Sequence, residues 1–403
     1  MEWKEVRLGD VCTRVCSGGT PKSTNLSYYG GEIPWLNTKE IDFNRIYSTE
    51  KTITDSGLNN SSAKWIVPNT ITVAMYGATA GKSCIVKVPM TTNQACCNLA
   101  INDKVADYEF VYYSLKNDYT TLASLANGGA QQNLNAQIIK DYVLKMPSLA
   151  DQHRIASILS SLDRKIELNN KINADLEEMA QAIFKNWFVD FEPFKDGKFV
   201  DSELGMIPEG WKVGCLGEMG AVVCGKTPSK ANSNYYGGDI PFIKIPDMHG
   251  NVFVENSEDR LTEEGSLSQI KKLIPPYSLM VSCIATVGLV SINTKPSHTN
   301  QQINTVIPHN KSALFYLYQH IKNNEEFLKN MGRGGTTTLN VNTKSFSNIR
   351  LLIPSETALE QFHGIVEGLF KKIELNMHES RTLSLLRDTL LPRLMSGEIE
   401  IPE

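Results

Sequence analysis

Two long stretches of the chain carry apolar residues at helical spacing. Residues 151–188 contain no glycine or proline, and their apolar residues recur at alternating steps of three and four. This spacing is typical of one stripe along an α-helix. A nearly matching pattern, interrupted at Arg387, returns near the C-terminus, and the pentapeptide KIELN stands unchanged at 165–169 and 372–376. Two helices with one apolar stripe each bury it most simply against one another, so we predict a helix pair.

Asparagine interrupts both apolar stripes at matching positions. Asn169 and Asn376 are the last residues of the two KIELN segments. A buried asparagine on such a seam fixes the register of a helix pair at a cost in stability. The alternative is that both side chains are solvated and merely tolerated, and the pattern alone leaves this open.

The rest of the chain consists of one sequence pattern that occurs twice. TPKSTNLSYYGGEIPW at 20–35 reappears as TPSKANSNYYGGDIPF at 227–242, and Asn93-Gln94 reappears as Asn300-Gln301. Each copy contains short β-rich runs broken by Pro, Gly and Asn. One helix is expected in each copy, near 108–125 and near 312–331. These patterns predict two similar mixed α+β domains, each leading into a long helix.

Composition places the chain among ordinary globular proteins. Of its 403 residues, 41% are hydrophobic, and no apolar run approaches the roughly 18 residues of a membrane helix. The N-terminus lacks the pattern of a signal peptide, which predicts a cytoplasmic protein. The eight cysteines are scattered without a CxxC pair, so we interpret them as reduced thiols and expect no metal site.

Charge is distributed unevenly along the chain. The net charge is −4, but residues 1–148 balance at +1 and residues 208–355 at +3, which leaves −8 for the remainder. The acidity therefore belongs to the helical parts. Because the local field decides what a surface attracts, the overall acidity does not exclude a nucleic-acid partner for the two large segments.

Catalytic motifs are present only as near misses. GATAGKS at 77–83 has three residues between its first Gly and the Gly-Lys pair, where a P-loop needs four. We interpret it as a turn between strands that projects Thr79 and Lys82 outward. IPPYS at 274–278 begins with Ile274, which cannot accept the hydrogen bond that an amino-methyltransferase motif requires. No other catalytic pattern is found, and no catalytic residue is predicted.

Polar, glycine-hinged tracts at equivalent places are the remaining candidates for function. NGGAQQNLN at 127–135 parallels GRGGTTTLN at 332–340. Asn and Gln can pair with adenine edges, Thr offers a hydroxyl or a methyl group, and Lys and Arg can contact phosphates. An ordinary solvated loop is the alternative for each residue. The candidate DNA-binding residues are Lys22, Lys39, Lys64, Thr79, Lys82, Gln131, Gln132 and Asn135 in the first copy, and Lys226, Lys230, Lys244, Thr286, Arg333, Thr336, Thr337 and Asn340 in the second.

The whole chain resembles the specificity subunit of type I restriction–modification systems. The resemblance rests on the doubled TPKSTNLSYYGGEIPW motif, the Gly-Gly-polar-Leu-Asn tracts, IPEGWK before the second copy, and the two KIELN helices. It implies two target recognition domains that read a bipartite, asymmetric double-stranded DNA site. The implied boundaries are 1–148 and 208–355 for these domains, 149–190 and 356–403 for two spacer helices, and 191–207 for a linker.

The resemblance also implies partners and an absence of cofactors on this chain. In the family the spacer helices form an antiparallel coiled coil with pseudo-twofold symmetry, on which two modification subunits dock. Those subunits methylate adenine N6 with S-adenosylmethionine, and restriction subunits add ATP- and Mg-dependent translocation and cleavage. The alternatives are an assembly scaffold that binds no DNA of its own and a self-contained nucleotide-binding or methyltransferase enzyme.

Overall fold

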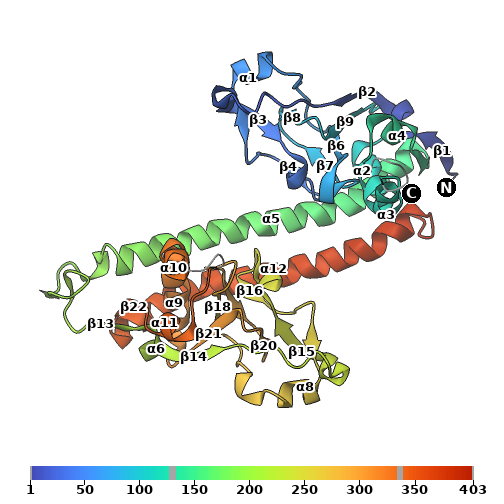
Figure 1. Cartoon of the computed structure of the whole chain (residues 1–403). Helices are drawn as coiled ribbons and strands as arrows, with labels where there is room; N and C mark the ends of the chain where they lie inside the picture. The colour runs from blue at the N-terminus through green and yellow to red at the C-terminus, as the bar shows by residue number, and fades with distance from the viewer. Residues whose placement is uncertain (1, 127–132, 334–338, 402–403) are drawn as a thin grey trace. The chain divides into compact units, whose positions relative to one another are not determined.

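The chain folds into two compact units, each built from segments far apart in the sequence. Unit 1 comprises Met1–Ile166 and Arg381–Glu403, and unit 2 comprises Glu167–Ser380. The computed structural model describes residues 2–126, 133–333 and 339–401 (Figure 1).

Each unit contains one mixed α/β domain and a segment of both long helices. These helices are α5 (Leu149–Phe188) and α12 (Glu356–Met395), each of 40 residues. Because both helices are divided between the units, the predicted boundaries at 148 and 207 stay predictions.

The mixed domain of unit 1 is organised around a five-stranded sheet. β2, β9, β6 and β7 pair antiparallel in that order, and the edge strand β4 runs parallel to β7. All side chains of β6 and β7 are buried, which explains their continuous apolar or small-residue composition. The strands are β2 (Cys12–Ser17), β4 (Arg45–Ile46), β6 (Ile71–Ala74), β7 (Ser83–Val86) and β9 (Cys96–Ile101).

A three-stranded sheet and a two-stranded sheet complete this domain. In the former, β3 pairs antiparallel with β5 and parallel with β8, and in the latter β1 pairs with β10. The bounds are β1 (Lys4–Arg7), β3 (Tyr29–Leu36), β5 (Thr52–Ile53), β8 (Thr91–Thr92) and β10 (Val143–Met146). The helices are η1 (Leu8–Val11), η2 (Leu26–Tyr28), η3 (Thr38–Glu40), α1 (Asp55–Asn59), η4 (Gly77–Thr79), α2 (Tyr108–Asn117), α3 (Tyr119–Ser124) and α4 (Ala136–Asp141).

Unit 2 repeats this topology strand for strand. Its sheets have the orders β14-β21-β18-β19-β16, β17-β15-β20 and β13-β22, with β16 parallel to β19 and β20 parallel to β15. The strands are β13 (Lys212–Cys215), β14 (Gly220–Cys224), β15 (Tyr236–Ile243), β16 (Phe253–Val254), β17 (Arg260–Leu261), β18 (Leu279–Ser282), β19 (Val290–Asn293), β20 (His298–Thr299), β21 (Ile303–Pro308) and β22 (Arg350–Ile353). The predicted doubling of one mixed domain is confirmed.

The helices of unit 2 follow a similar order. They are η5 (Glu192–Phe194), α6 (Leu216–Met219), η6 (Ser233–Tyr235), α7 (Ile245–Met248), α8 (Glu263–Leu267), η7 (Ile270–Lys272), η8 (Lys311–Ala313), α9 (Leu314–Asn323), α10 (Glu325–Gly332) and α11 (Thr343–Ser347). Of these, η5, η7 and η8 have no counterpart among the described helices of unit 1, and η4 has none among those described in unit 2. α9 packs between the sheet and the long helices, because its aromatic residues join one core with β18, β19, α5 and α12 (Figure 1).

The single helix predicted near 108–125 is wrong in one respect, because it is two helices. α2 ends at Asn117 and α3 begins at Tyr119, and Asp118 between them has non-helical dihedrals. The hydroxyl of Tyr142 donates a hydrogen bond to the Asp118 carboxylate at 3.2 Å. The counterpart near 312–331 breaks in the same way at Asn324. Short polar side chains compete with the helix for backbone partners, which explains a break at these residues.

The first long helix is uninterrupted, as its pattern predicts. It begins after Ser148, whose hydroxyl accepts a hydrogen bond from the amide of Asp151 at 3.2 Å and so acts as a cap. The second long helix ends at Met395 rather than continuing to 403. Gly397 follows with φ +74°, a left-handed conformation that glycine adopts without steric cost and that commonly ends helices.

The two helices pack antiparallel within each unit. In unit 2, Phe184 on α5 contacts Phe362 on α12 with ring centroids 6.3 Å apart, and Asn169 bonds to the segment around Asn376. In unit 1, Arg387 on α12 reaches Asp163 on α5 at 2.6 Å. Residues later on one helix therefore meet residues earlier on the other, which is the predicted antiparallel pair.

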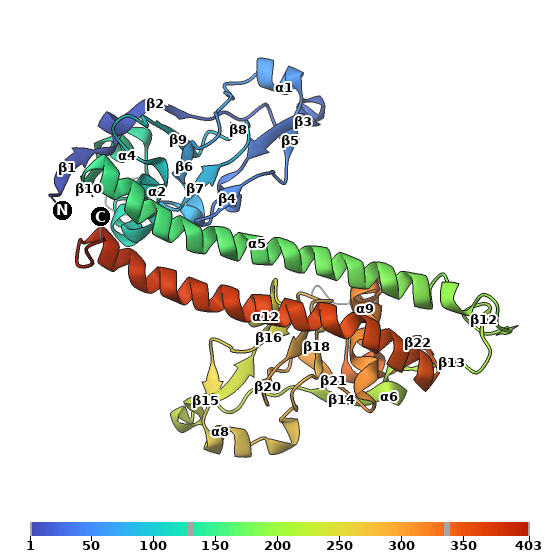
Figure 2. The same cartoon turned by 180° about the vertical axis from the view of Figure 1, so that it is seen from behind.

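The two ends of the described chain lie side by side in unit 1 (Figure 2). Trp3 and Ile399 pack against the same apolar core, and Trp3 also contacts Phe110 of α2 with ring centroids 6.3 Å apart. Trp211 has the equivalent place in unit 2, where it packs against Phe188 at 5.8 Å. The repeated tryptophan therefore joins the start of each domain to a long helix.

The stretch predicted as a linker has local structure of its own. β11 (Phe199–Val200) and β12 (Ile207–Pro208) form a two-stranded hairpin. Phe194 packs edge-on against Trp211 with ring centroids 4.8 Å apart. The composition of residues 191–207 indicated a break between the copies, but it did not indicate that Phe194 packs against Trp211.

Candidate nucleic-acid interface

The repeated motif forms the same framework of hydrogen bonds in both units. The Thr20 hydroxyl donates to the Gln94 side chain, and the Thr227 hydroxyl donates to the Gln301 side chain. The hydroxyls of Tyr29 and Tyr236 donate to the carbonyls of Pro21 and Pro228 at 2.6 and 2.8 Å. The residues that the two copies share therefore form the scaffold. The residues that differ between the copies are those that this scaffold exposes.

Close backbone contact explains one invariant glycine of the repeat. A Cβ atom added at Gly18 would lie 2.2 Å from the carbonyl oxygen of Thr92, and one at Gly225 would lie 2.2 Å from that of Asn300. No side chain fits at that distance. The chain directly after β2 in unit 1, and directly after β14 in unit 2, is therefore held against the three-stranded sheet at the same point.

Several predicted residues of unit 1 meet at the turn that joins β6 to β7. The predicted turn is present, but its side chains do not project freely. The Thr79 hydroxyl donates to the carbonyl of Thr38 at 2.9 Å. Lys82 is half-buried and donates to Asp42 at 2.6 Å. The outward projection is therefore wrong for both residues, because loop residues 38–42 supply partners that the sequence pattern did not indicate.

The glycine-hinged tract of unit 1 returns to this same turn. The amide of Leu134 donates to the carbonyl of Met75, directly after β6, at 3.0 Å. Asn135 accepts a hydrogen bond from the amide of Ile138 at 2.9 Å and so caps α4, which is a structural role. The predicted base-reading residues Gln131 and Gln132 lie outside the described residues.

Tyr76 is a candidate that the sequence patterns do not single out. It lies between β6 and η4 with 39% of its surface exposed, next to the point where the tract returns. Exposed aromatic rings offer stacking surfaces for nucleic-acid bases. An aromatic residue that ends a wholly buried strand is the sequence signal that marks such a position.

The equivalent edge of unit 2 has a different chemistry. Asn340 forms an isolated antiparallel bridge with Ile284 after β18, and Thr286 beside it is exposed. Arg333, at the end of α10, donates to the Asn330 side chain at 2.6 Å. Thr336 and Thr337 lie outside the described residues. The two units thus bring equivalent segments together at an edge whose exposed side chains differ.

The predicted phosphate-contacting lysines divide into two groups. Lys39 lies 2.6 Å from Glu50, whose hydrogen bond raises the lysine pKa, and Lys244 is paired with Asp259. Lys82 is paired with Asp42 in the same way, so these three lysines are neutralised by acidic neighbours. The others are exposed and, in the described parts of the chain, form no ion pair: Lys22, Lys64, Lys226 and Lys230.

The seam asparagines are buried, so the solvated alternative is wrong. Asn169 is 0% exposed and Asn376 1%. The Asn169 side-chain amide donates to Ser380 at 3.2 Å and to Glu379 at 2.9 Å. The Asn376 side-chain amide donates to Asn173 at 2.9 Å. Polar groups therefore bond across the helix pair at its matching positions, and their role in fixing the register stays a prediction.

One serine–histidine pair has the distance of a nucleophile and its base. The Ser266 hydroxyl lies 2.8 Å from Nε2 of His298, and Gln269 lies 3.4 Å from Nδ1. All three side chains are buried. Burial lowers the pKa of His298 to about 4, and no carboxylate orients the ring. The arrangement is a satisfied polar cluster in the core rather than a site that a substrate can reach.

The side chains that could support thiol or metal chemistry are not arranged for it in the described parts of the chain. Burial raises the pKa of the Cys12 thiol to about 12 and that of Cys283 to about 11, so these thiols are not nucleophilic at neutral pH. Within the described residues, no three His, Cys, Asp or Glu side chains lie close enough to hold a metal ion. The described helices include none long and apolar enough to cross a membrane.

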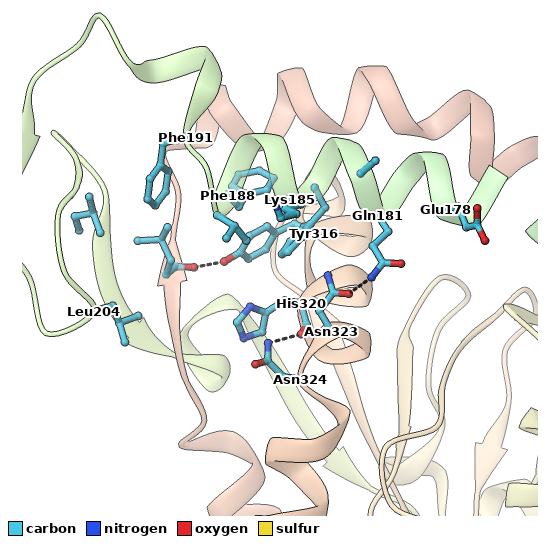
Figure 3. A pocket seen from close by; sticks show the side chains of 15 residues that line it. Glu178, Gln181, Lys185, Phe188, Phe191, Leu204, Tyr316, His320, Asn323 and Asn324 are labelled. Carbon is cyan, nitrogen blue, oxygen red and sulfur yellow. Dashed lines mark hydrogen bonds between the residues drawn. The ribbon is translucent and has the colours of Figure 1, made fainter. Parts of the chain in front are cut away.

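A pocket of about 760 Å³ in unit 2 is mostly apolar (Figure 3). Phe188 and Tyr316 form its wall, and Gln181 bonds to Asn323 at 2.8 Å along its rim. His320 faces it with a pKa that burial lowers to about 4. Its lining contains one carboxylate, Glu178, and no serine or cysteine, so the pocket suits packing rather than catalysis.

This architecture places the chain in a defined class. The family model of the type I restriction modification DNA specificity domain matches residues 1–178 and again residues 208–384. The chain therefore belongs to the family of type I restriction–modification specificity subunits, which recognise DNA target sequences. The two matches coincide with the two copies of the repeat.

Individual relatives cover the chain from end to end. The chain is 32% identical to the type I restriction enzyme HindI specificity subunit of Haemophilus influenzae, over 99% of this chain and 100% of that protein. It is 30% identical to the MjaIX specificity subunit of Methanocaldococcus jannaschii, over 100% and 94%. The S subunit structure from M. genitalium matches with a TM-score of 0.61 at 17% identity, over 98% and 96%, which supports the fold alone.

Proposed function

We propose that this specificity subunit reads a bipartite, asymmetric DNA site, with one half read by each mixed domain. The observation that carries this proposal is that the two domains share one hydrogen-bonded framework but expose different side chains at its edge. Thr20–Gln94 and Thr227–Gln301 hold the two scaffolds alike. Exposed Tyr76 marks the edge of unit 1, whereas residues 283–286 at the equivalent edge of unit 2 contain no aromatic side chain. Two scaffolds of one design with different edges suit two different half-sites.

We propose further that this chain is not itself catalytic and holds no cofactor. Methyl transfer from S-adenosylmethionine to adenine N6 then belongs to two modification subunits. ATP- and Mg-dependent translocation and cleavage belong to restriction subunits. The near-miss character of residues 77–83 and 274–278 supports this division, as does the buried position of the Ser266–His298 pair.

Two matching apolar stripes on the long helices support docking of two equal partners. On α5, Leu168 and Met179 are 51% and 52% exposed, and on α12, Leu375 and Leu386 are 57% and 45% exposed. Each pair is separated by 11 residues, about three helical turns, so its members share one face. Large apolar side chains grouped on a surface mark interaction sites. The helices thus offer the same stripe twice, one for each modification subunit.

Exchanging one domain tests the reading of half-sites. Residues 1–148 would be replaced by the corresponding domain of another specificity subunit, and the variant co-expressed with its modification subunits. Genome-wide mapping of methylated adenines should show one altered half-site and one unchanged half-site. A change in both halves, or in neither, would contradict the proposal, and loss of all sequence preference would favour an assembly scaffold.

Charged substitutions on the stripes test the docking. Leu168→Glu with Met179→Glu should remove one modification subunit from the co-purified complex, and Leu375→Glu with Leu386→Glu should remove the other. Native mass spectrometry counts the subunits directly. Ala174→Glu is the matched control, because it lies exposed on α5 outside the stripe and should leave the full count.

A further inference from the structure

A charged network joins the mixed domain of unit 1 to its helices. Arg45 on β4 lies 3.2 Å from Glu109 on α2 and 3.7 Å from Asp163 on α5. The carboxylate of Asp163 also accepts hydrogen bonds from the Tyr113 hydroxyl at 2.5 Å and from Arg387 on α12 at 2.6 Å. One carboxylate thus binds a strand, a domain helix and the second long helix. We name these five residues joint 1.

The charges of joint 1 are withdrawn from solvent. The side chain of Arg45 is 3% exposed, those of Glu109 and Asp163 are 8% exposed, and that of Arg387 is 16% exposed. A buried charge is tolerated only when it is paired and hydrogen-bonded. Each member of the network therefore depends on the others being in place.

The equivalent positions of unit 2 follow from strand register and helix position. Arg45 pairs with Ile85 at the start of β4, and Phe253 pairs with Ile292 at the start of β16. Glu109 is the second residue and Tyr113 the sixth of ten in α2. Phe315 and Gln319 hold the same places in α9.

The long helices are matched by their shared KIELN segments. These segments place Asp163 opposite Phe370 in the alignment and Arg387 opposite Ala180. In sum, an arginine, two carboxylates and a second arginine in unit 1 correspond to three phenylalanines and an alanine in unit 2.

The second joint is an aromatic stack instead of an ion network. Phe315 lies parallel to Phe370 with ring centroids 4.1 Å apart and an interplanar angle of 6°. Phe253 meets the same Phe370 edge-on at 6.4 Å, and Ala180 is fully buried in the same core. We name Phe253, Phe315, Gln319, Phe370 and Ala180 joint 2.

We propose that the two joints are a docking code that assigns each recognition domain to its own pair of helix segments. The domain faces are Arg45, Glu109 and Tyr113 in one unit and Phe253, Phe315 and Gln319 in the other. The helix faces are Asp163 with Arg387, and Phe370 with Ala180. A domain placed on the other helix face buries the Arg45–Glu109 pair against Phe370 without the partner Asp163, which costs stability. The shared sheet topology leaves the two domains otherwise interchangeable.

A thermodynamic cycle on the full-length chain tests the code. The domain set Arg45→Phe, Glu109→Phe and Tyr113→Gln, the helix set Asp163→Phe and Arg387→Ala, and their combination convert joint 1 to the residues of joint 2. Each set alone should lower the thermal midpoint of unit 1 by roughly 6–20 °C, because the remaining buried pair, Asp163–Arg387 or Arg45–Glu109, then faces apolar side chains without its partners across the joint. The combination should recover at least half of the larger loss.

The experiment measures folding and not DNA recognition, so failure of the docking code can be told apart from failure of the proposed DNA-reading function. Recovery in the combined variant supports the code, and losses that simply add overturn it. Hydrogen exchange of the α2 amides assigns each loss to the joint. As a control, Lys39→Ala with Glu50→Ala removes an exposed ion pair of the same unit and should leave the midpoint within about 2 °C.

Exchanging the domains between positions gives an independent second arm. Residues 208–355 placed before α5 and residues 1–148 placed after residue 207 should give little folded protein on the natural helices. The same exchange with Asp163→Phe, Arg387→Ala, Phe370→Asp and Ala180→Arg should restore soluble chain with a cooperative transition. Equal yields from the two exchanged chains would overturn the proposal.

Discussion

Joint 1 and joint 2 hold the same backbone arrangement by opposite chemistry. Asp163 binds two arginines and a tyrosine in unit 1, whereas Phe370 packs against two phenylalanines in unit 2. Strand order and the Thr20–Gln94 type of hydrogen bond are the same in both units. The fold is therefore specified by the sheet framework, and the joint is free to vary provided that both of its faces vary together.

The difference also predicts different responses to substitution. An ion network fails when a single member is removed, because the remaining charges stay buried. An aromatic stack loses area and packing in proportion to what is removed.

The largest effect is expected at the centre of joint 1. Asp163→Ala should lower the free energy of unfolding of unit 1 by about 3–5 kcal/mol, since Arg45 and Arg387 lose their shared partner. Phe370→Leu at the matching position should cost less than about 1.5 kcal/mol, because it conserves most of the volume. Chemical denaturation followed by hydrogen exchange in each unit measures both. Equal costs would remove the contrast between the joints.

Acid should destabilise unit 2 before unit 1 through two histidines, His298 and His320, whose pKa values burial lowers to about 4. His298 has a folded pKa of about 4, below its unfolded value of 6.5, so the unfolded state binds the proton first. Its contribution is fully present above pH 6.5 and is lost as the pH falls toward 4, by up to about 3 kcal/mol.

Unit 1 has Thr91 at the position of His298, because Thr91 pairs with Trp35 as His298 pairs with Phe242. The histidine of the described part of unit 1, His153, has a side chain that is 57% exposed and lies 2.6 Å from Asp107. The pH dependence of the stability of unit 2 between pH 4 and 7 should fall by about half in His298→Gln, and further when His320→Gln is added. An unchanged pH slope in that variant would assign the acid sensitivity to another group.

The helix seam should show a smaller cost. Asn376→Leu removes the donor that Asn173 accepts at 2.9 Å inside the helix pair, leaving a buried carbonyl without that partner. We expect a loss of about 1–3 kcal/mol, measured by urea denaturation. Replacing Asn173 with leucine in the same chain should return part of this loss, because both polar partners are then removed together.

The smallest effect concerns DNA binding at the lysines. Lys22→Ala and Lys64→Ala should each weaken binding to all sequences and reduce the salt slope of the binding constant by about 1. Lys39→Ala should change the slope less, because Glu50 already pairs with it at 2.6 Å. Titrations of the complex at several salt concentrations measure these slopes. Equal slopes for Lys22→Ala and Lys39→Ala would show that an ion pair with an acidic neighbour does not reduce the contribution of a lysine to DNA binding.

The repeated motifs and the apolar periodicity were enough to predict the doubled design. Apolar spacing gave α5 along its whole length, and β-rich runs gave the central strands β6, β7 and β9. These features are local, because hydrophobic periodicity follows directly from the geometry of a helix or strand. The repeat then identified the second unit, since an equal order of landmarks implies an equal order of strands.

The tertiary structure alone decided which side chains meet. Arg45 and Asp163 are 118 positions apart and carry no local signal that they share one network. The partners of Thr79 and Lys82 likewise come from a separate loop, so the expected free side chains are bound. Contacts of this kind depend on burial and on distances that only the packed chain defines. Local periodicity therefore predicts the elements of this protein, whereas packing decides which of its charges are available to a partner.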